Sequence, residues 1–160
     1  MFLHICVLCV YYGRVIEEER VNIQAAECSV GGIPLNKDKI MKTVLIVDDD
    51  ITVYKMLEPA LTASGFGVFC AKTGEEGLTM SRDKKPDIII LDVILPGIKG
   101  REVCAAIKKD QATKNTPVLF LTSKDSPDDV QAEIEVGAVG HLTKPVNPQY
   151  LVARIKKILG

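Results

Sequence analysis

The feature of this chain that most constrains its fold is an alternation, from residue 43 onward, between short apolar runs and longer segments of helical periodicity. The runs are rich in Val and Ile, which is typical of strands that are buried on both faces. Right-handed crossovers between such strands place the intervening helices on both faces of one sheet. The pattern therefore predicts an α/β fold with a doubly wound, five-stranded parallel sheet. The predicted strands are residues 43–47, 66–71, 87–91, 117–121 and 140–143.

Helix start and stop signals separate the predicted strands. Helical spacing extends over residues 51–64, and Gly65 follows at the position where a left-handed residue commonly ends a helix. Pro59 lies inside this segment and is expected to kink the helix or to cost about 3 kcal/mol of helix stability. Thr73 and Glu76 are predicted to form a capping box at the start of the second helix. The later helices are predicted to begin at Gly100, Ser126 and Asn147.

The composition is that of one soluble globular domain, with 160 residues of which 47% are hydrophobic and 26% are charged. The formal net charge is -1 and no basic stretch stands out, which argues against a nucleic-acid surface. The five cysteines are odd in number and scattered, so we expect a reducing, cytoplasmic compartment rather than a disulfide framework.

The cysteines themselves carry little chemistry in this interpretation. Cys6 and Cys9 form a C-x-x-C pair, but a zinc site needs a second ligand pair that His4 alone does not supply. Cys70 and Cys104 lie in apolar patterns and are expected to be buried for packing.

The segment before Met41 is interpreted as an N-terminal extension of residues 1–40, either a disordered tail or a start assigned too far upstream. Its apolar residues 2–12 are too few to span a bilayer, which takes about 20 residues. They also lack the features of a secretory signal. A membrane-surface anchor is the rival interpretation, although the segment lacks the basic face that such anchors use. The domain proper is expected over residues 41–160.

Polar residues follow four of the predicted strands at their carboxyl ends. In open parallel sheets these ends meet at one edge, where ligands bind. Close carboxylates repel one another by roughly 4 kcal/mol at about 4 Å and an effective dielectric near 20, so an acidic cluster there indicates a bound cation such as Mg²⁺. A carboxylate can also act as a nucleophile, and an amine with a hydroxyl can clamp a transferring phosphoryl group. The residues are Asp48, Asp49, Asp92, Thr122 and Lys144.

These residues lie in motifs that resemble, in order and spacing, the receiver domains of two-component response regulators. The motifs are the run Val-Leu-Ile-Val-Asp48-Asp49-Asp50, the turn Asp92-Val-Ile-Leu-Pro96-Gly, the strand end Leu-Thr122-Ser and the pair Lys144-Pro145. The resemblance covers nearly everything after Met41 and implies a flavodoxin-like sheet with strand order 2-1-3-4-5. It also implies a stand-alone receiver of the chemotaxis-regulator type, because the sequence stops directly after the fifth helix.

The resemblance assigns a role to each residue of the acidic site. Asp92 is similar to the phosphoacceptor, which also contacts the metal. Asp48 and Asp49 are similar to the acidic pair that holds Mg²⁺, with the backbone carbonyl of Ile94 as a further ligand. Lys144 is similar to the lysine that pairs with the acceptor and then with the phosphate, and its bond to Pro145 is expected to be cis.

The resemblance also assigns two residues to the conformational change that follows phosphorylation. Thr122 is similar to the hydroxyl that moves toward the phosphoryl group, and His141 stands where similar proteins carry Tyr or Phe that swings inward. Ile94 and Lys124 flank the site, two residues beyond Asp92 and Thr122. Because the Ile94 side chain cannot orient a water molecule, we predict slow self-dephosphorylation.

The partners implied are proteins. A sensor histidine kinase or a histidine phosphotransfer protein would donate the phosphoryl group, and a downstream protein would bind the rearranged surface. Direct contact with nucleic acid or membrane is not expected, and neither is enzyme activity beyond slow autophosphatase activity.

Other interpretations stay open. A pseudo-receiver would keep the fold without regulation by phosphate. A haloacid-dehalogenase-like phosphatase would use Asp48 as nucleophile and Asp50 as general acid, since Asp48-x-Asp50-x-Thr52 follows a strand. Purely structural roles are also available: helix capping for Asp48 and Asp49, a turn for Asp92, strand packing for Thr122, a partly exposed strand-end position for His141, and an exposed loop charge for Lys144.

Overall fold

The structure, a computed structural model, describes residues 41–123, 131–132 and 134–160. The interpretations of residues 1–40, including the C-x-x-C pair, lie outside the described residues. So does the predicted helix start at Ser126, although residues 131, 132, 134 and 135 are helical.

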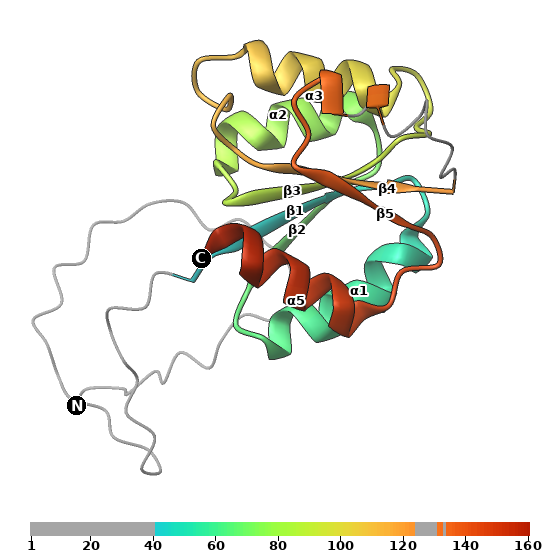
Figure 1. Ribbon diagram of the computed structural model, residues 1–160, viewed down its shortest axis with the longest axis vertical. Coiled ribbons are helices and arrows are strands. Elements are labelled where there is room, and N and C mark those ends of the chain that lie inside the picture. The colour runs from blue at the N-terminus through green and yellow to red at the C-terminus, as the bar shows by residue number, and fades with distance from the viewer. Residues whose placement is uncertain (1–40, 124–130, 133) are drawn as a thin grey trace, which may run out of the picture. The chain divides into compact units, whose positions relative to one another are not determined.

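Five parallel strands form one sheet in the order β2-β1-β3-β4-β5, which confirms the predicted doubly wound architecture (Figure 1). The strands are β1 (Thr43–Val47), β2 (Gly67–Ala71), β3 (Ile88–Asp92), β4 (Val118–Thr122) and β5 (Gly140–Thr143). The helices with described bounds are α1 (Ile51–Ala63), α2 (Gly74–Lys84), α3 (Gly100–Lys109) and α5 (Pro148–Leu159).

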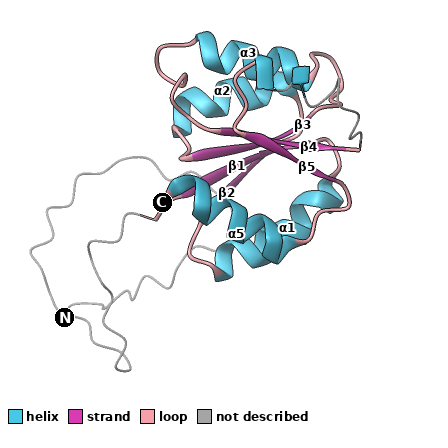
Figure 2. Ribbon diagram, viewed as in Figure 1, coloured by secondary structure: helices cyan, strands magenta, loops and turns pink. Residues whose placement is uncertain are grey.

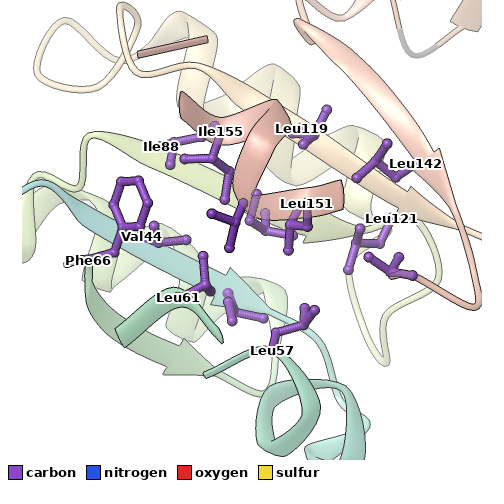
Figure 3. Close-up of a cluster of buried hydrophobic side chains, with 14 residues drawn as sticks. Val44, Leu57, Leu61, Phe66, Ile88, Leu119, Leu121, Leu142, Leu151 and Ile155 are labelled. Carbon is purple, nitrogen blue, oxygen red and sulfur yellow. The ribbon is translucent and has the colours of Figure 1, made fainter. Parts of the chain in front are cut away.

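The helices cover both faces of the sheet, with α1 and α5 on one face and α2 and α3 on the other (Figure 2). Successive strand residues point to opposite faces, so each central strand contributes to two cores. Val44 and Ile46 of β1 pack toward α1 and α5, whereas Leu45 and Val47 pack toward α2 and α3. Figure 3 shows the first of these cores, in which Leu57 and Leu61 of α1 and Leu151 and Ile155 of α5 meet the strands.

The helix signals behave largely as predicted. Asn147 caps α5 by accepting from the Tyr150 N–H, and Pro148 occupies the first turn. Helix α1 ends at Ala63 and is followed by Gly65 with φ of 84°. Pro59 does not end α1, which continues through it as one helix.

Several local predictions are wrong in detail: Cys70, expected to be buried, is only partly buried, and β2 and β4 begin one residue later than predicted, at Gly67 and Val118. Thr73 accepts from the Glu76 N–H, but the Glu76 carboxylate accepts from the Lys72 N–H at 2.8 Å, so the reciprocal half of the capping box is displaced by one residue. Strand β3 also begins one residue late, at Ile88 rather than at Asp87, whose carboxylate accepts from the N–H and hydroxyl of Thr43 at the start of β1.

No helix in the described part of the chain has the length and apolar character needed to cross a membrane.

Candidate functional site

Three carboxylates meet at the carboxyl edge of the sheet. Asp48 follows β1 and is 1% exposed, Asp92 is the last residue of β3 and is 7% exposed, and Asp49 is exposed. One ligand oxygen of each lies within 4.8 Å of the other two. Because β1 and β3 are neighbours in the sheet, the two buried carboxylates are delivered side by side.

Lys144, in the loop after β5, reaches across the sheet to this cluster. Its Nζ atom lies 2.6 Å from Oδ2 of Asp92 and 2.7 Å from Oδ2 of Asp48. The Lys144 side chain is 24% exposed, and the Asp48 side chain is fully buried. A single ammonium therefore bridges two largely desolvated carboxylates, which is a charge-assisted contact rather than a solvated surface pair.

Backbone N–H groups hold the opposite oxygens of the same two carboxylates. The Asp50 N–H donates to Oδ1 of Asp48, and the Ile94 N–H donates to Oδ1 of Asp92, each at 3.0 Å. Each side chain is thus fixed by a donor two residues further along its own loop and by Lys144. This arrangement limits rotation of both carboxylates before any ligand binds.

Burial and hydrogen bonding shift the pKa values in opposing ways. Burial raises the pKa of Asp48, and the hydrogen bonds from Lys144 and from the Asp50 N–H oppose it only in part. Burial lowers the pKa of Lys144, but the hydrogen bonds to Asp48 and Asp92 outweigh it and raise the pKa overall. Lys144 is therefore an ammonium ion at neutral pH.

The described residues offer a donor set that fits Mg²⁺. All three side chains provide oxygen ligands, which Mg²⁺ prefers, and Mg²⁺ usually takes one or two protein carboxylates with water and phosphate. Three carboxylates face one ammonium, so the cluster retains negative charge that a divalent cation would balance.

Thr122 ends β4 at the same edge. It is 2% exposed, and its backbone carbonyl accepts from the Lys144 N–H at 2.7 Å. The Lys144–Pro145 peptide bond is cis, as predicted.

His141 lies on β5 opposite Phe120 of β4 and is partly buried. The Ile94 side chain is 58% exposed beside the acidic cluster, and Lys124 lies outside the described residues. The predicted roles of His141 and of the Ile94 carbonyl as a metal ligand stay predictions.

Sequence reasoning missed the contribution of Gly100. A Cβ atom at this position would lie 2.0 Å from the backbone carbonyl oxygen of Asp92 and 2.9 Å from Cα of Val93. The Gly100 N–H donates to the Val93 carbonyl at 3.1 Å, so the first residue of α3 packs directly on the loop that carries Asp92. The available signal was a glycine inside the first turn of a predicted helix, where glycine is less favourable than alanine by about 1 kcal/mol.

Comparison with known proteins agrees with this geometry. A sequence model of the response regulator receiver domain matches residues 44–156. The phosphate regulon transcriptional regulatory protein PhoB of Pseudomonas aeruginosa is 39% identical over 118 residues, which are 74% of this chain and 52% of PhoB. The transcriptional regulatory protein AfsQ1 of Streptomyces coelicolor is 40% identical over 119 residues, again 74% of this chain and 52% of the relative.

Among solved structures, the chemotaxis protein CheY4 of Vibrio cholerae superposes with a TM-score of 0.71 at 37% identity, covering 74% of this chain and 99% of CheY4. The chain spans about half the length of the curated relatives that it matches.

Proposed function

This chain belongs to the response regulator receiver family, and on that premise we propose that it accepts a phosphoryl group on Asp92 in a Mg²⁺-dependent reaction. The observation that supports this most directly is the bridge from Lys144 to Asp92 and Asp48, with Asp49 completing the acidic cluster. A nucleophilic carboxylate, a cation clamp and a set of metal-ligand oxygens are the groups that phosphoryl transfer requires.

The residues of the chain divide the chemistry among them. A carboxylate oxygen of Asp92 attacks phosphorus, and Lys144 keeps its ammonium beside that carboxylate and beside the incoming phosphoryl oxygens. Thr122 offers a hydroxyl from the end of β4. Asp48, Asp49, Asp92 and the backbone carbonyl of Ile94 would hold Mg²⁺, which when bound would add positive charge against the phosphoryl oxygens.

The output is proposed to be a population shift. Phosphorylation favours a state in which Thr122 moves toward the phosphoryl group and the surface near His141 rearranges. The donor would be a sensor histidine kinase or a histidine phosphotransfer protein, and the reader a downstream protein, with all three in the cytoplasm. Self-dephosphorylation is proposed to be slow because the exposed apolar side chain of Ile94 offers no group that orients water.

We propose residues 41–160 as the receiver domain and residues 1–40 as an extension of it. A peptide map of the native protein tests the second part. Peptides from before Met41 would exclude a natural start at Met41, whereas their absence would support it.

The rival phosphatase interpretation gains no support from Asp50. Its Oδ1 atom accepts from the Thr52 N–H at 2.8 Å, so Asp50 serves as the N-cap of α1 rather than as a general acid. The pseudo-receiver interpretation differs from our proposal only in whether Asp92 is modified.

The test is the intact mass of the protein after incubation with acetyl phosphate and Mg²⁺. We expect one added phosphoryl group on the wild type with Mg²⁺. We expect none on the wild type without metal, and none on Asp92→Asn or Asp48→Asn. No adduct on any form would support the pseudo-receiver. Turnover of small phosphate esters that needs Asp48 and not Asp92 would establish a phosphatase.

A further inference from the structure

A pocket of about 340 Å³ opens beside the acidic cluster, on the side of the loop between β3 and α3. The loop contributes apolar groups that directly follow Asp92, the start of α3 contributes two basic side chains, and β4 contributes a hydroxyl. The lining includes Val93, Ile94, Leu95, Lys99, Arg101 and Thr122.

The charge of this pocket differs from that of the acidic cluster next to it. The described lining residues include Lys99 and Arg101 but no carboxylate. Lys144 lines a separate, smaller hollow of about 160 Å³ together with Asp50 and apolar residues of α1. The cations of the larger pocket are therefore additional to Lys144 and are held by a different element, α3.

The position of the pocket relates it to the reacting group. Val93 and Ile94 line it and directly follow Asp92, whose Oδ1 atom accepts from the Ile94 N–H. Thr122 lines it from the neighbouring strand. A small phosphodonor whose phosphorus approaches Asp92 therefore has this pocket beside it as a space for the rest of its atoms.

We infer that this pocket receives the leaving group of small phosphodonors and that Lys99 and Arg101 make the site favour acyl phosphates over phosphoramidate among them. The inference rests on the proposed function of Asp92. It assigns Lys99 and Arg101 as specificity-determining residues that act on the leaving group, whereas Lys144 acts on the acceptor.

The chemistry of the transfer explains the selectivity. An Asp92 carboxylate oxygen forms a bond to phosphorus, and the bond from phosphorus to the acyl oxygen breaks. The electron pair leaves on that oxygen, so the product is a carboxylate anion and no proton is needed. With phosphoramidate, the phosphorus–nitrogen bond breaks, and the protonated nitrogen leaves as neutral ammonia. Only the acyl phosphate develops negative charge on its leaving group, and only that charge is stabilised by nearby cations.

The experiment compares rate constants for phosphorylation by acetyl phosphate and by phosphoramidate, at saturating Mg²⁺, by intact mass. The variants are Lys99→Gln, Arg101→Gln, the double variant and Arg101→Lys. Lys109→Gln is the matched control, because Lys109 is an exposed cation of the same helix that does not line the pocket. Thermal unfolding of each variant checks the fold, and the exposed Lys99 keeps the test valid if Arg101→Gln does not fold.

We expect the ratio of the acetyl phosphate rate to the phosphoramidate rate to fall about tenfold in the double variant and about threefold in Lys99→Gln. Arg101→Lys should keep most of the ratio, and Lys109→Gln should keep all of it. An unchanged ratio in the folded variants, or an equal fall in Lys109→Gln, would overturn the inference. Absence of any Asp92 adduct with both donors would instead overturn the proposed function.

Discussion

The Nζ atom of Lys144 lies 2.6 Å from Oδ2 of Asp92 and so ties the loop after β5 to the end of β3, two strands away across β4. The same atom contacts the fully buried carboxylate of Asp48. Lys144 thus has a structural effect as well as a chemical one, because its removal leaves neighbouring carboxylates without their counter-ion.

Replacing Lys144 with alanine should destabilise the protein most strongly when Mg²⁺ is absent. Leaving a buried charge without its partner costs about 3 kcal/mol, so the free energy of unfolding measured in urea should fall by roughly that amount. Added Mg²⁺ should stabilise the variant more than the wild type, since a divalent cation can replace the missing positive charge. Lys157→Ala, at an exposed position of α5, should leave both quantities unchanged. Equal stability of Lys144→Ala and wild type without Mg²⁺ would contradict this role.

Gly100→Ala should impair both stability and phosphorylation. The added methyl group would collide with the Asp92 carbonyl oxygen, at 2.0 Å, and backbone cannot move aside as a side chain can. Overpacking of this kind costs about 1–3 kcal/mol or more, and any relief must shift the loop that holds Asp92. Urea unfolding and the rate of adduct formation with acetyl phosphate measure the two effects.

Gly77→Ala provides the comparison for this experiment. Its Cβ would meet the Val47 side chain at 3.0 Å, so the neighbour is a side chain rather than the backbone of the loop that carries Asp92. We expect a smaller loss of stability and normal phosphorylation. If Gly77→Ala slowed phosphorylation as much as Gly100→Ala, the close approach at Asp92 would not be the cause.

Much of the fold was predictable because its strands are buried on both faces. Residues Val44–Val47 are completely buried, and such a continuous apolar run predicts a buried strand even when the neighbouring strands and helices are unknown. The rule that parallel strands end at one edge then brought Asp48, Asp92 and Thr122 together. The resemblance of the motifs to a known family supplied the strand order and the pairing of Lys144 with Asp92.

The contacts of the site were less predictable, because they depend on side-chain reach and on how closely backbones approach. Nothing in the sequence around Lys144 shows that one ammonium contacts both Asp48 and Asp92. The need for glycine at residue 100 arises from the carbonyl of Asp92, eight residues earlier, which only the folded turn brings within contact. The displaced capping contact from Glu76 to Lys72 has the same origin in local geometry.

Ile94→Asn should shorten the lifetime of the phosphorylated protein. The Ile94 side chain is 58% exposed next to Asp92, and an amide there could orient a water molecule toward phosphorus. We expect the adduct to be lost about tenfold faster than from the wild type. The measurement is the intact mass of the protein over time after the donor is removed. Val139→Asn is the control, since Val139 is 43% exposed but precedes β5 at the opposite edge of the sheet. A wild-type adduct that decays fast, and whose lifetime Ile94→Asn leaves unchanged, would refute the predicted slow self-dephosphorylation.

The link between α2 and the end of α3 should make stability depend on pH. The Asp110 carboxylate accepts from the Ala112 N–H at 2.9 Å and from Arg82 Nε at 2.6 Å, and these contacts, the backbone one first, lower the pKa of Asp110 below its ordinary value of 3.8. The stabilisation is therefore fully present above pH 3.8 and is lost as the pH falls through the lower pKa of the folded state. Asp110→Asn should be less stable than wild type at neutral pH, and the difference in urea midpoint should shrink below about pH 4.

Arg82→Gln separates the two contributions to this effect. Because the hydrogen bond from the Ala112 N–H is the largest single cause of the lowered pKa and does not depend on Arg82, Arg82→Gln should retain part of the pH dependence that Asp110→Asn removes. The measurement is the urea midpoint of each variant at a series of pH values. A difference between wild type and Asp110→Asn that stays constant as the pH falls would mean that the charge of Asp110 contributes nothing. A complete loss of the pH dependence in Arg82→Gln would assign the effect to the ion pair rather than to the backbone.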